Sequence, residues 1–479
     1  MHINLDSRLF KKSFCYLCSG KTTDQMKNIT RLFIAAFLLA CIFSCDKQPI
    51  VDIEGGAVQG VPSAASGVTV FKGIPYAAPP VGDLRWREPQ PVIPWEGVKV
   101  ADTFGPIPWQ EDLSKMDLYG KEFYADGMPE MGEDCLYLNI WAPTNAVKRG
   151  GKFPVALWIH GGAVRHGFSN EITFDGDAWA ERGVILVTFN YREGILGFLG
   201  HKLLSTEDGA EQRSGNYALY DMVAALNWVR DNISAFGGDP DNITLFGQSA
   251  GARSVQTLVC APLTEGMIAK AIIQSGGGIN PELQGRELLY TRVWEAGEAF
   301  CKFAGYETLE QMRAASPQEL MLKYDEYTAT GESIPMGPMV DMKICEGSFT
   351  SAASQNHIHD IPYMIGSTLG DGMDRARDIE QFCASRCFYG GKPVFDYLFT
   401  RRLPGDDAGA FHSAELWYMF GTLDRCWRPF TEDDMKLSRQ MLAAWTNFCK
   451  YGNPCGKEQT GFWLPYTEAD PFRKILDVE

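Results

Sequence analysis

A serine between two glycines stands where a predicted strand meets a predicted helix, in the run FGQSAGA at residues 246–252. Residues 242–246 favour a buried strand, and a helical pattern follows the motif. A strand that turns abruptly into a helix at Gly-x-Ser-x-Gly is typical of a nucleophile elbow, whose strained backbone exposes the serine. Gly247 and Gly251 would let a neighbouring chain segment approach closely. The motif therefore predicts a nucleophile, Ser249; the alternative is an ordinary turn whose serine caps the helix.

The alternation of strand and helix continues along the chain. Continuous runs of β-branched and aromatic residues predict buried strands, and residues 216–235 carry apolar side chains at helical spacing up to Gly237. This order favours a mainly parallel sheet that is covered by helices on both faces, in one domain. The predicted strands are 153–159, 184–189, 242–246, 271–274 and 362–366, and a late helix is predicted at 434–450.

Composition limits the class of protein. The chain has 479 residues, of which 45% are hydrophobic and 22% charged, so a large core is available. Its 60 acidic residues outnumber 44 basic ones, for a net charge of −16. Nucleic acid is therefore not expected as the main partner, because phosphate binding needs a basic surface. Apolar residues are dispersed apart from one run near the start, which excludes a polytopic membrane protein.

That uncharged run, residues 32–44, is too short to span a bilayer but suits the apolar part of a secretion signal. A short basic segment precedes it at residues 26–31, and Cys45 follows it. This pattern is similar to a bacterial lipoprotein signal in which Cys45 becomes lipidated, with Cys41 as the second candidate. An ordinary signal peptide or a single anchor helix are the alternatives. We expect an exported protein at the periplasm or cell surface, held to the membrane only by that anchor.

Residues 1–25 add nothing to such a signal, so Met26 is predicted as the true start and 1–25 as an upstream extension. N-terminal sequencing would test this. The remaining 46–479 are predicted to form a single domain, with 38 basic against 58 acidic residues.

Nine cysteines follow Cys45, an odd and scattered set that does not indicate a disulfide scaffold. Cys383 with Cys387, and Cys449 with Cys455, lie close enough in sequence to bridge locally. No pattern of ligands points to a metal site. Most of these thiols are predicted to be free and partly buried.

A serine nucleophile needs a general base, and histidine serves most often. On this fold the chain order is serine, acid, histidine. His357 and His359 come just before the predicted strand 362–366, which leaves little room for an acid, whereas His412 leaves ample room. Elimination therefore selects His412, since the remaining histidines all precede Ser249: His2, His160, His166 and His201.

The acid is predicted in the loop after strand 362–366, at the sheet edge where catalytic groups collect. Asp371 stands there between two glycines, and Asp374 is the near alternative. Asp406 and Asp407 lie too close to His412 in sequence.

When a serine attacks a carbonyl carbon, the developing oxyanion also needs backbone donors. His160-Gly161-Gly162-Ala163 ends a predicted strand, where small residues expose their amides. Gly162 and Ala163, together with Ala250 after the nucleophile, are predicted to form the oxyanion hole.

Together these motifs resemble the type-B carboxylesterases, the carboxylesterase and cholinesterase group of α/β-hydrolases. The resemblance implies the α/β-hydrolase fold, hydrolysis of small-molecule esters through an acyl-enzyme without metal or organic cofactor, and Asp371 as the acid. A non-catalytic cholinesterase-like binding protein, or a thioesterase or amidase using the same triad, are the alternatives. The matching segments are 71–91, 133–143, 154–163, 187–199 and 215–252, with weaker ones at 272–277, 337–341, 361–373, 409–423 and 444–454.

The same resemblance assigns a structural ion pair to Arg85 and Glu133. Gln248 replaces the glutamate that often precedes the nucleophile in this family. Cys135 matches a half-cystine of animal members, but Pro108 stands where its partner would be expected. That disulfide is therefore not expected.

Two further differences from the family pattern concern the entrance to the active site. Only 41 positions separate Asp371 from His412, fewer than the family normally has. We expect a reduced helical region around the active-site gorge and a more open entrance. Arg165 and His166 follow the oxyanion strand where the family commonly has an aromatic residue. They would form a cationic rim that prefers anionic acyl groups, or else they are solvated loop charges.

Overall fold

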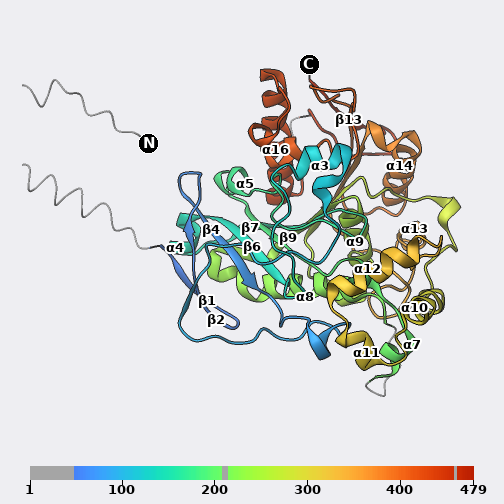
Figure 1. Cartoon of the computed structure of the whole chain (residues 1–479). Coiled ribbons are helices and arrows are strands. Elements are labelled where there is room, and N and C mark those ends of the chain that lie inside the picture. The colour runs from blue at the N-terminus through green and yellow to red at the C-terminus, as the bar shows by residue number, and fades with distance from the viewer. Residues whose placement is uncertain (1–47, 208–213, 458–460, 479) are drawn as a thin grey trace, which may run out of the picture. The chain divides into compact units, whose positions relative to one another are not determined.

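The computed structural model describes residues 48–207, 214–457 and 461–478. Residues Pro49–Glu479 form one compact unit (Figure 1). The predicted start at Met26, the signal peptide and lipidation at Cys45 or Cys41 lie outside the described residues and stay predictions. Within the described ranges, no helix combines the length and the apolar character that a membrane span requires.

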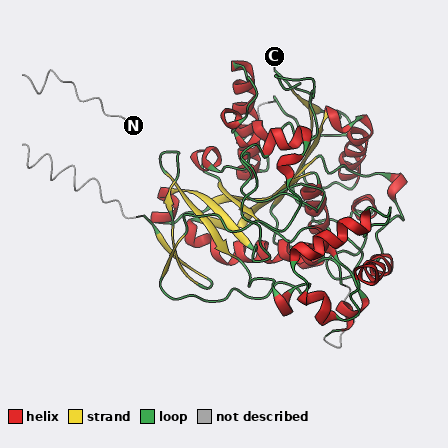
Figure 2. Cartoon of the chain, viewed as in Figure 1, coloured by secondary structure: helices red, strands yellow, loops and turns green. Residues whose placement is uncertain are grey.

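A ten-stranded sheet runs through this unit between layers of helices (Figure 2). Its strands are parallel from β13 across to β8 and antiparallel from β8 to β3. The predicted mostly parallel sheet covered by helices is therefore confirmed. In spatial order the strands are β13 (Arg473–Leu476), β12 (Val394–Phe399), β11 (Tyr363–Thr368), β10 (Lys270–Gln274), β9 (Gly238–Gln248), β7 (Phe153–Ile159), β8 (Ile185–Phe189), β6 (Tyr137–Pro143), β4 (Val68–Pro75) and β3 (Val61–Pro62).

A small second sheet pairs β1 (Ile50–Ile53), β2 (Gly56–Gln59) and β5 (Val98–Val100). The described α-helices are α3 (Asp117–Phe123), α4 (Thr144–Arg149), α5 (Asp177–Glu181), α6 (Gly194–Phe198), α7 (Lys202–Thr206), α8 (Tyr217–Asn232), α9 (Ala250–Leu258), α10 (Tyr290–Ala304), α11 (Leu309–Ala314), α12 (Pro317–Thr328), α13 (Phe349–Ser354), α14 (Met373–Phe388), α15 (Leu416–Phe420) and α16 (Glu432–Tyr451).

The central parallel strand β7 is buried on both faces from Val155 to Ile159, which explains its unbroken apolar sequence. In β7, Val155 and Leu157 belong to one core cluster, whereas Ala156 and Trp158 belong to the other. The first cluster includes side chains of α8, α9 and α14, and the second includes side chains of α5, α15 and α16. The helices therefore form layers on opposite faces of the sheet, and the carboxyl ends of the strands stay free to carry a site.

Most of the predicted elements occur with shifted ends. The strand predicted at 242–246 begins earlier and ends later, as β9. The helix predicted at 216–235 is α8 followed by a 3₁₀ turn that ends at Gly237, whose φ of 81° is left-handed. The late helix predicted at 434–450 begins two residues earlier, at Glu432 after its Thr431 cap, and ends at Tyr451. Among the elements that were not predicted are β4, β6, β12 and β13 of the large sheet and the helix α14.

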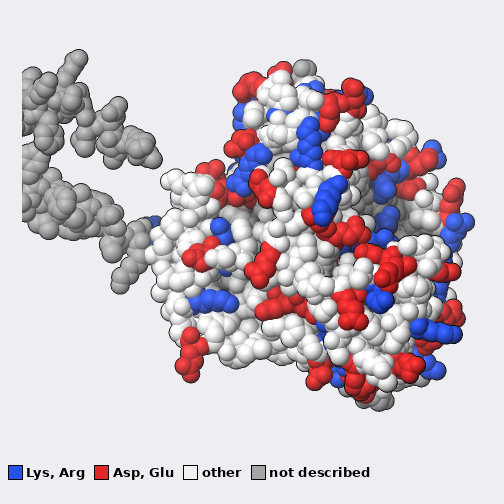
Figure 3. All heavy atoms as spheres, viewed as in Figure 1, with Lys and Arg blue, Asp and Glu red and all other residues white. Residues whose placement is uncertain are grey.

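The segment between Asp371 and His412 contains α14, β12 and a loop, with no further helix among its described residues. All nine cysteines beyond residue 48 are free, so neither Cys383 with Cys387 nor Cys449 with Cys455 forms a bridge. On the surface, acidic and basic side chains are interspersed, without a continuous basic tract on the face shown (Figure 3).

Candidate active site

Ser249 lies in the sharp turn between β9 and α9. Its backbone has φ 57° and ψ −120°, a left-handed conformation that is costly for a residue with a side chain. Such strain typically marks functional sites, where the surrounding packing holds the residue in place. The turn projects the residue at the carboxyl edge of the sheet, as the sequence motif predicted.

The two glycines of the motif allow this turn to pack against β7. An ideal Cβ on Gly251 would lie 2.1 Å from the carbonyl oxygen of Ile159, and one on Gly247 would lie 2.7 Å from the same oxygen. Both distances are well below ordinary van der Waals contact, and the obstacle is backbone. No side chain fits at either position without moving β7 away from the elbow.

Gly251→Ala is therefore expected to destabilise the protein by about 3 kcal/mol, because β7 and α9 must separate to admit the methyl group. Thermal unfolding measures the effect. Gly347→Ala is the matched control, since no atom lies within 4 Å of an ideal Cβ there. Equal melting temperatures for the two variants would contradict this account of the elbow.

Asp371 and His412 are brought together although 41 positions separate them. His412 Nδ1 lies 2.5 Å from Asp371 Oδ1. The other carboxylate oxygen accepts hydrogen bonds from Ser275 Oγ at 2.6 Å and from the Thr368 amide at 3.0 Å. Burial opposes ionisation of Asp371, but these hydrogen bonds and the His412 interaction outweigh it and lower the pKa of the carboxyl group. The pair is thus an ionised carboxylate that orients an imidazole.

The opposite edge of this imidazole faces the elbow. His412 Nε2 lies 3.3 Å from Gln248 Nε2, and Gln248 directly precedes Ser249. Tyr119 also contacts His412, because its hydroxyl donates to the His412 carbonyl at 3.0 Å. The imidazole therefore lies between Asp371 and the turn that carries Ser249.

Asp374, the alternative acid, is not part of this arrangement. Its side chain is 89% exposed and pairs with Arg377 at 2.9 Å on the surface of α14. Of the two candidate acids, only Asp371 contacts His412.

Sequence reasoning missed a second buried carboxylate, Glu415. It follows His412 by three residues and is completely buried, with Gln274 Nε2 as a donor at 3.4 Å. Burial and the nearby charge of Asp371 raise the pKa of Glu415 to about 7. The protonated form therefore avoids placing a second negative charge beside the Asp371–His412 pair. A glutamate one turn after the selected histidine is the signal that could have drawn attention to it.

The predicted oxyanion loop lies against Ser249. An ideal Cβ on Gly161 would be 3.2 Å from Ser249 Cβ. Gly162 has a φ of 112° and Ala163 a φ of 56°, so the backbone turns sharply here. Among the described residues, the amides of Gly162 and Ala163 donate to no other group. The amide of Ala250, as the first residue of α9, has no partner within its helix. All three predicted donors therefore have unused amides near the elbow.

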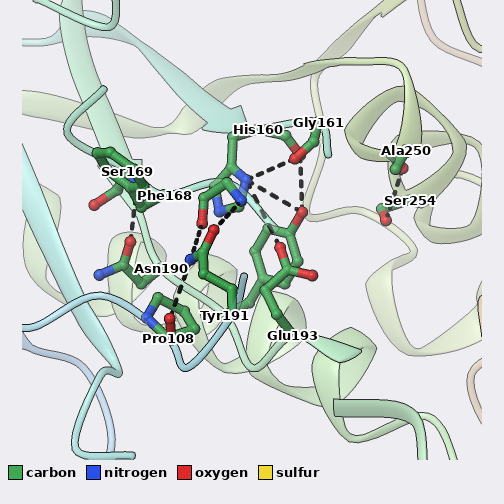
Figure 4. A network of polar contacts seen from close by, with 12 residues as sticks. Pro108, His160, Gly161, Phe168, Ser169, Asn190, Tyr191, Glu193, Ala250 and Ser254 are labelled. Atoms are coloured by element: carbon green, nitrogen blue, oxygen red, sulfur yellow. Dashed lines mark hydrogen bonds and ion pairs between the residues drawn. The ribbon is translucent and has the colours of Figure 1, made fainter. Parts of the chain in front are cut away.

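A buried polar network supports this loop from behind (Figure 4). Tyr191 donates its hydroxyl to the His160 carbonyl at 2.8 Å, and His160 Nδ1 lies 2.9 Å from the Gly161 carbonyl. The carboxylate of Glu193 lies 3.9 Å from the same nitrogen. Burial lowers the pKa of His160 to about 4 and raises that of Glu193. Both side chains are therefore held in their neutral forms beneath the loop.

Arg165 and His166 lie beyond the oxyanion loop, in a turn closed by hydrogen bonds from both amides to the Gly162 carbonyl. Arg165 is exposed, and His166 is half-buried with a lowered pKa caused by burial and by the charge of Arg165. Neither side chain contacts the Asp371–His412 pair. The ion pair assigned to Arg85 and Glu133 is present, with two contacts of 2.6 Å. In the described part of the chain, no group of three or more His, Cys, Asp or Glu side chains is arranged to hold a metal ion.

A strained serine between a central parallel strand and its following helix, at the carboxyl edge of such a sheet, defines an α/β-hydrolase. The chain belongs to the carboxylesterase family, whose model matches residues 47–385 and 377–477, and it is a carboxylic-ester hydrolase. The resemblance drawn from the sequence motifs is confirmed.

Several characterised proteins are similar along most of their length. The fumonisin B1 esterase of Sphingopyxis macrogoltabida is 34% identical, over 85% of this chain and 83% of that protein. The para-nitrobenzyl esterase of Bacillus subtilis is 33% identical, over 90% and 95%. Among solved structures, a thermophilic para-nitrobenzyl esterase superimposes with a TM-score of 0.77 at 32% identity, over 90% of this chain and 96% of that one. The carboxylesterase EST55 of Geobacillus stearothermophilus gives 0.73 at 29% identity, with the same coverage.

Proposed function

We propose that Ser249, His412 and Asp371 act as a catalytic triad that hydrolyses carboxylic esters through an acyl-enzyme. The observation that carries this proposal is the position of the His412 imidazole. Its Nδ1 contacts the Asp371 carboxylate at 2.5 Å, and its Nε2 faces the elbow beside Gln248. An imidazole held in this way can take a proton from Ser249.

In the acylation step, Ser249 Oγ attacks the ester carbonyl carbon while His412 Nε2 accepts the hydroxyl proton. The carbonyl oxygen becomes an oxyanion, which the amides of Gly162, Ala163 and Ala250 stabilise. The bond between the carbonyl carbon and the alcohol oxygen then breaks, and His412 returns its proton to that oxygen. Asp371 keeps the proton of neutral His412 on Nδ1 and stabilises the imidazolium that forms transiently.

In the deacylation step, a water molecule takes the place of the departed alcohol. His412 accepts one of its protons as the oxygen attacks the acyl carbon, and the same three amides hold the second oxyanion. The bond to Ser249 Oγ breaks, the proton returns to the serine, and the free acid leaves. The substrates we propose are small esters, a choice supported by the similarity to a para-nitrobenzyl esterase.

The test combines hydrolysis with labelling of the nucleophile. We expect the protein to hydrolyse p-nitrophenyl acetate and butyrate, and to react with a fluorophosphonate that adds once, on the peptide containing Ser249. Ser249→Ala should take no label. An unlabelled, inactive wild-type protein that is folded by circular dichroism would refute the proposal, as would a label on another serine.

A further inference from the structure

His412 lies in a long connection between β12 and α15. Residues 400–415 form no helix or strand, and the imidazole that they carry is 32% exposed. Loops are in general less restrained than the elements that they connect. Since a displacement of about 1 Å at a catalytic group can lower the rate roughly 100-fold, this loop has to be held in place.

The backbone next to His412 is also strained. Ser413 has a φ of 82°, a left-handed conformation that is costly for a residue with a side chain. Such a residue keeps its conformation only where surrounding contacts fix it. The His412 carbonyl and the Ser413 amide belong to one planar peptide group. A hydrogen bond to that carbonyl therefore fixes the peptide that joins the base to the strained residue.

The hydrogen bond to this peptide comes from α3. The Tyr119 hydroxyl donates to the His412 carbonyl at 3.0 Å, and among the described residues no backbone amide donates to the same oxygen. Burial and the negative charge of Asp371 raise the pKa of Tyr119 to about 12. The hydroxyl therefore keeps its proton and remains a donor throughout the neutral pH range.

Aromatic packing fixes the position of Tyr119. Its ring packs edge to face against Phe411, with 6.3 Å between the ring centroids, and stacks with Phe123 at 5.9 Å. Phe123 in turn stacks on Trp417 at 5.6 Å. Phe411 and Trp417 lie on either side of His412 in the sequence. The helix α3 therefore packs against both ends of the segment that presents the imidazole.

A buried ion pair anchors α3 to the same segment. Glu122 and Arg428 have completely buried side chains and pair at 2.9 Å. The Glu122 carboxylate also accepts from Trp417 Nε1 at 2.9 Å, and Arg428 donates to Asp406 at 2.8 and 3.0 Å. Asp406 precedes His412 and Trp417 follows it. A shift of α3 would break these buried contacts, which is strongly unfavourable.

We propose that Tyr119 is a positioning residue for the catalytic base: its hydrogen bond to the His412 carbonyl keeps the imidazole aligned with the nucleophile. Tyr119 acts through the backbone of His412 and takes no part in proton transfer. The short connection between Asp371 and His412 is thus supported by a helix from a distant part of the sequence. This inference rests on the proposed function, because it concerns the base of that reaction.

The variant Tyr119→Phe removes the hydroxyl and keeps the aromatic packing. We expect kcat for p-nitrophenyl butyrate to fall roughly 5- to 10-fold, the value of one hydrogen bond, while KM changes by less than about twofold. The rate of fluorophosphonate labelling should fall by the same factor, because that reaction needs the same base. Steady-state kinetics and time courses of labelling measure these effects.

Two controls separate positioning of the base from a general loss of structure. The Tyr389 hydroxyl also donates to a backbone carbonyl, that of Ser354 at 3.1 Å, but it lies at the opposite end of α14 from Asp371. Tyr389→Phe should therefore keep wild-type kcat. In the His412→Ala background the backbone carbonyl remains. Adding Tyr119→Phe there should lower the melting temperature as it does in the wild type, without lowering the residual rate further.

Wild-type kcat and labelling in folded Tyr119→Phe would overturn the inference. A raised KM with unchanged kcat would do the same, because Tyr119 would then bind substrate. An equal loss in Tyr389→Phe, or a further loss of rate in the His412→Ala background, would show that the effect does not act through the imidazole. Failure of the proposed function looks different, since the wild type would then hydrolyse no ester and Ser249 would take no label.

Discussion

Replacing His412 by alanine is expected to lower kcat for p-nitrophenyl butyrate by roughly 10⁴ to 10⁶, as much as replacing Ser249 by alanine. The reason is that serine without a base, or base without a serine, performs no nucleophilic step. The double variant should be no worse than either single variant, because the two residues act as one unit. Steady-state kinetics of the three variants, with a sensitive assay for the residual rate, measure this.

His357→Ala is the matched control for this prediction. His357 also follows Ser249 in the chain, but its side chain is exposed in the loop before β11. We expect its kcat to equal that of the wild type. A large loss in His357→Ala, or additive losses in the double variant, would contradict the assignment of His412 as the base.

Sequence patterns predicted the elbow and the base, whereas spacing left the acid open between Asp371 and Asp374, and the family resemblance then selected Asp371. The order of serine, acid and histidine, applied to only seven histidines, was enough to select His412. Asp371 and Asp374 both follow β11, but their side chains point in different directions. Asp371 turns inward to accept from Ser275, a residue at the end of a neighbouring strand. That hydrogen bond depends on the register between β10 and β11, which a local sequence pattern does not determine.

One strand that sequence reasoning missed, β12, contains a charge that is compensated at long range. In β12, Asp396 interrupts an apolar run, and it is buried because Arg473 of β13 pairs with it at 2.7 Å. A single charged residue in an apolar run predicts an exposed loop, because burying an unpaired charge is costly. The partner lies 77 positions away, so only the folded sheet shows why the charge is tolerated.

The same reasoning explains why parts of the site were not foreseen. Glu415 lies beside a helix whose apolar pattern does not point to it, and its place in the site depends on Gln274 and Asp371, which lie on other elements. The sequence instead drew attention to Arg165 and His166, because they depart from a family motif beside the oxyanion loop.

Asp371→Asn is expected to lower kcat by roughly 10⁴ while leaving the fold intact. An asparagine amide placed opposite His412 Nδ1 would donate to that nitrogen instead of accepting from it. The imidazole would then carry its proton on Nε2, where it must be empty to accept the proton of Ser249. The substitution also removes the negative charge that stabilises the imidazolium. Steady-state kcat and the rate of fluorophosphonate labelling should fall together, because both reactions need the same base.

Asp374→Asn is the control for Asp371→Asn. It also removes a negative charge at the start of α14, but Asp374 does not contact His412. Asp374 is exposed and pairs with Arg377 on the surface, so we expect wild-type kcat and labelling. The comparison also tests the shortened segment between Asp371 and His412. If that segment keeps Asp371 in contact with His412 during catalysis, as in the 2.5 Å contact of the structure, the loss in Asp371→Asn will be large. A loss of less than about tenfold would mean that Asp371 does not fix the imidazole tautomer during catalysis.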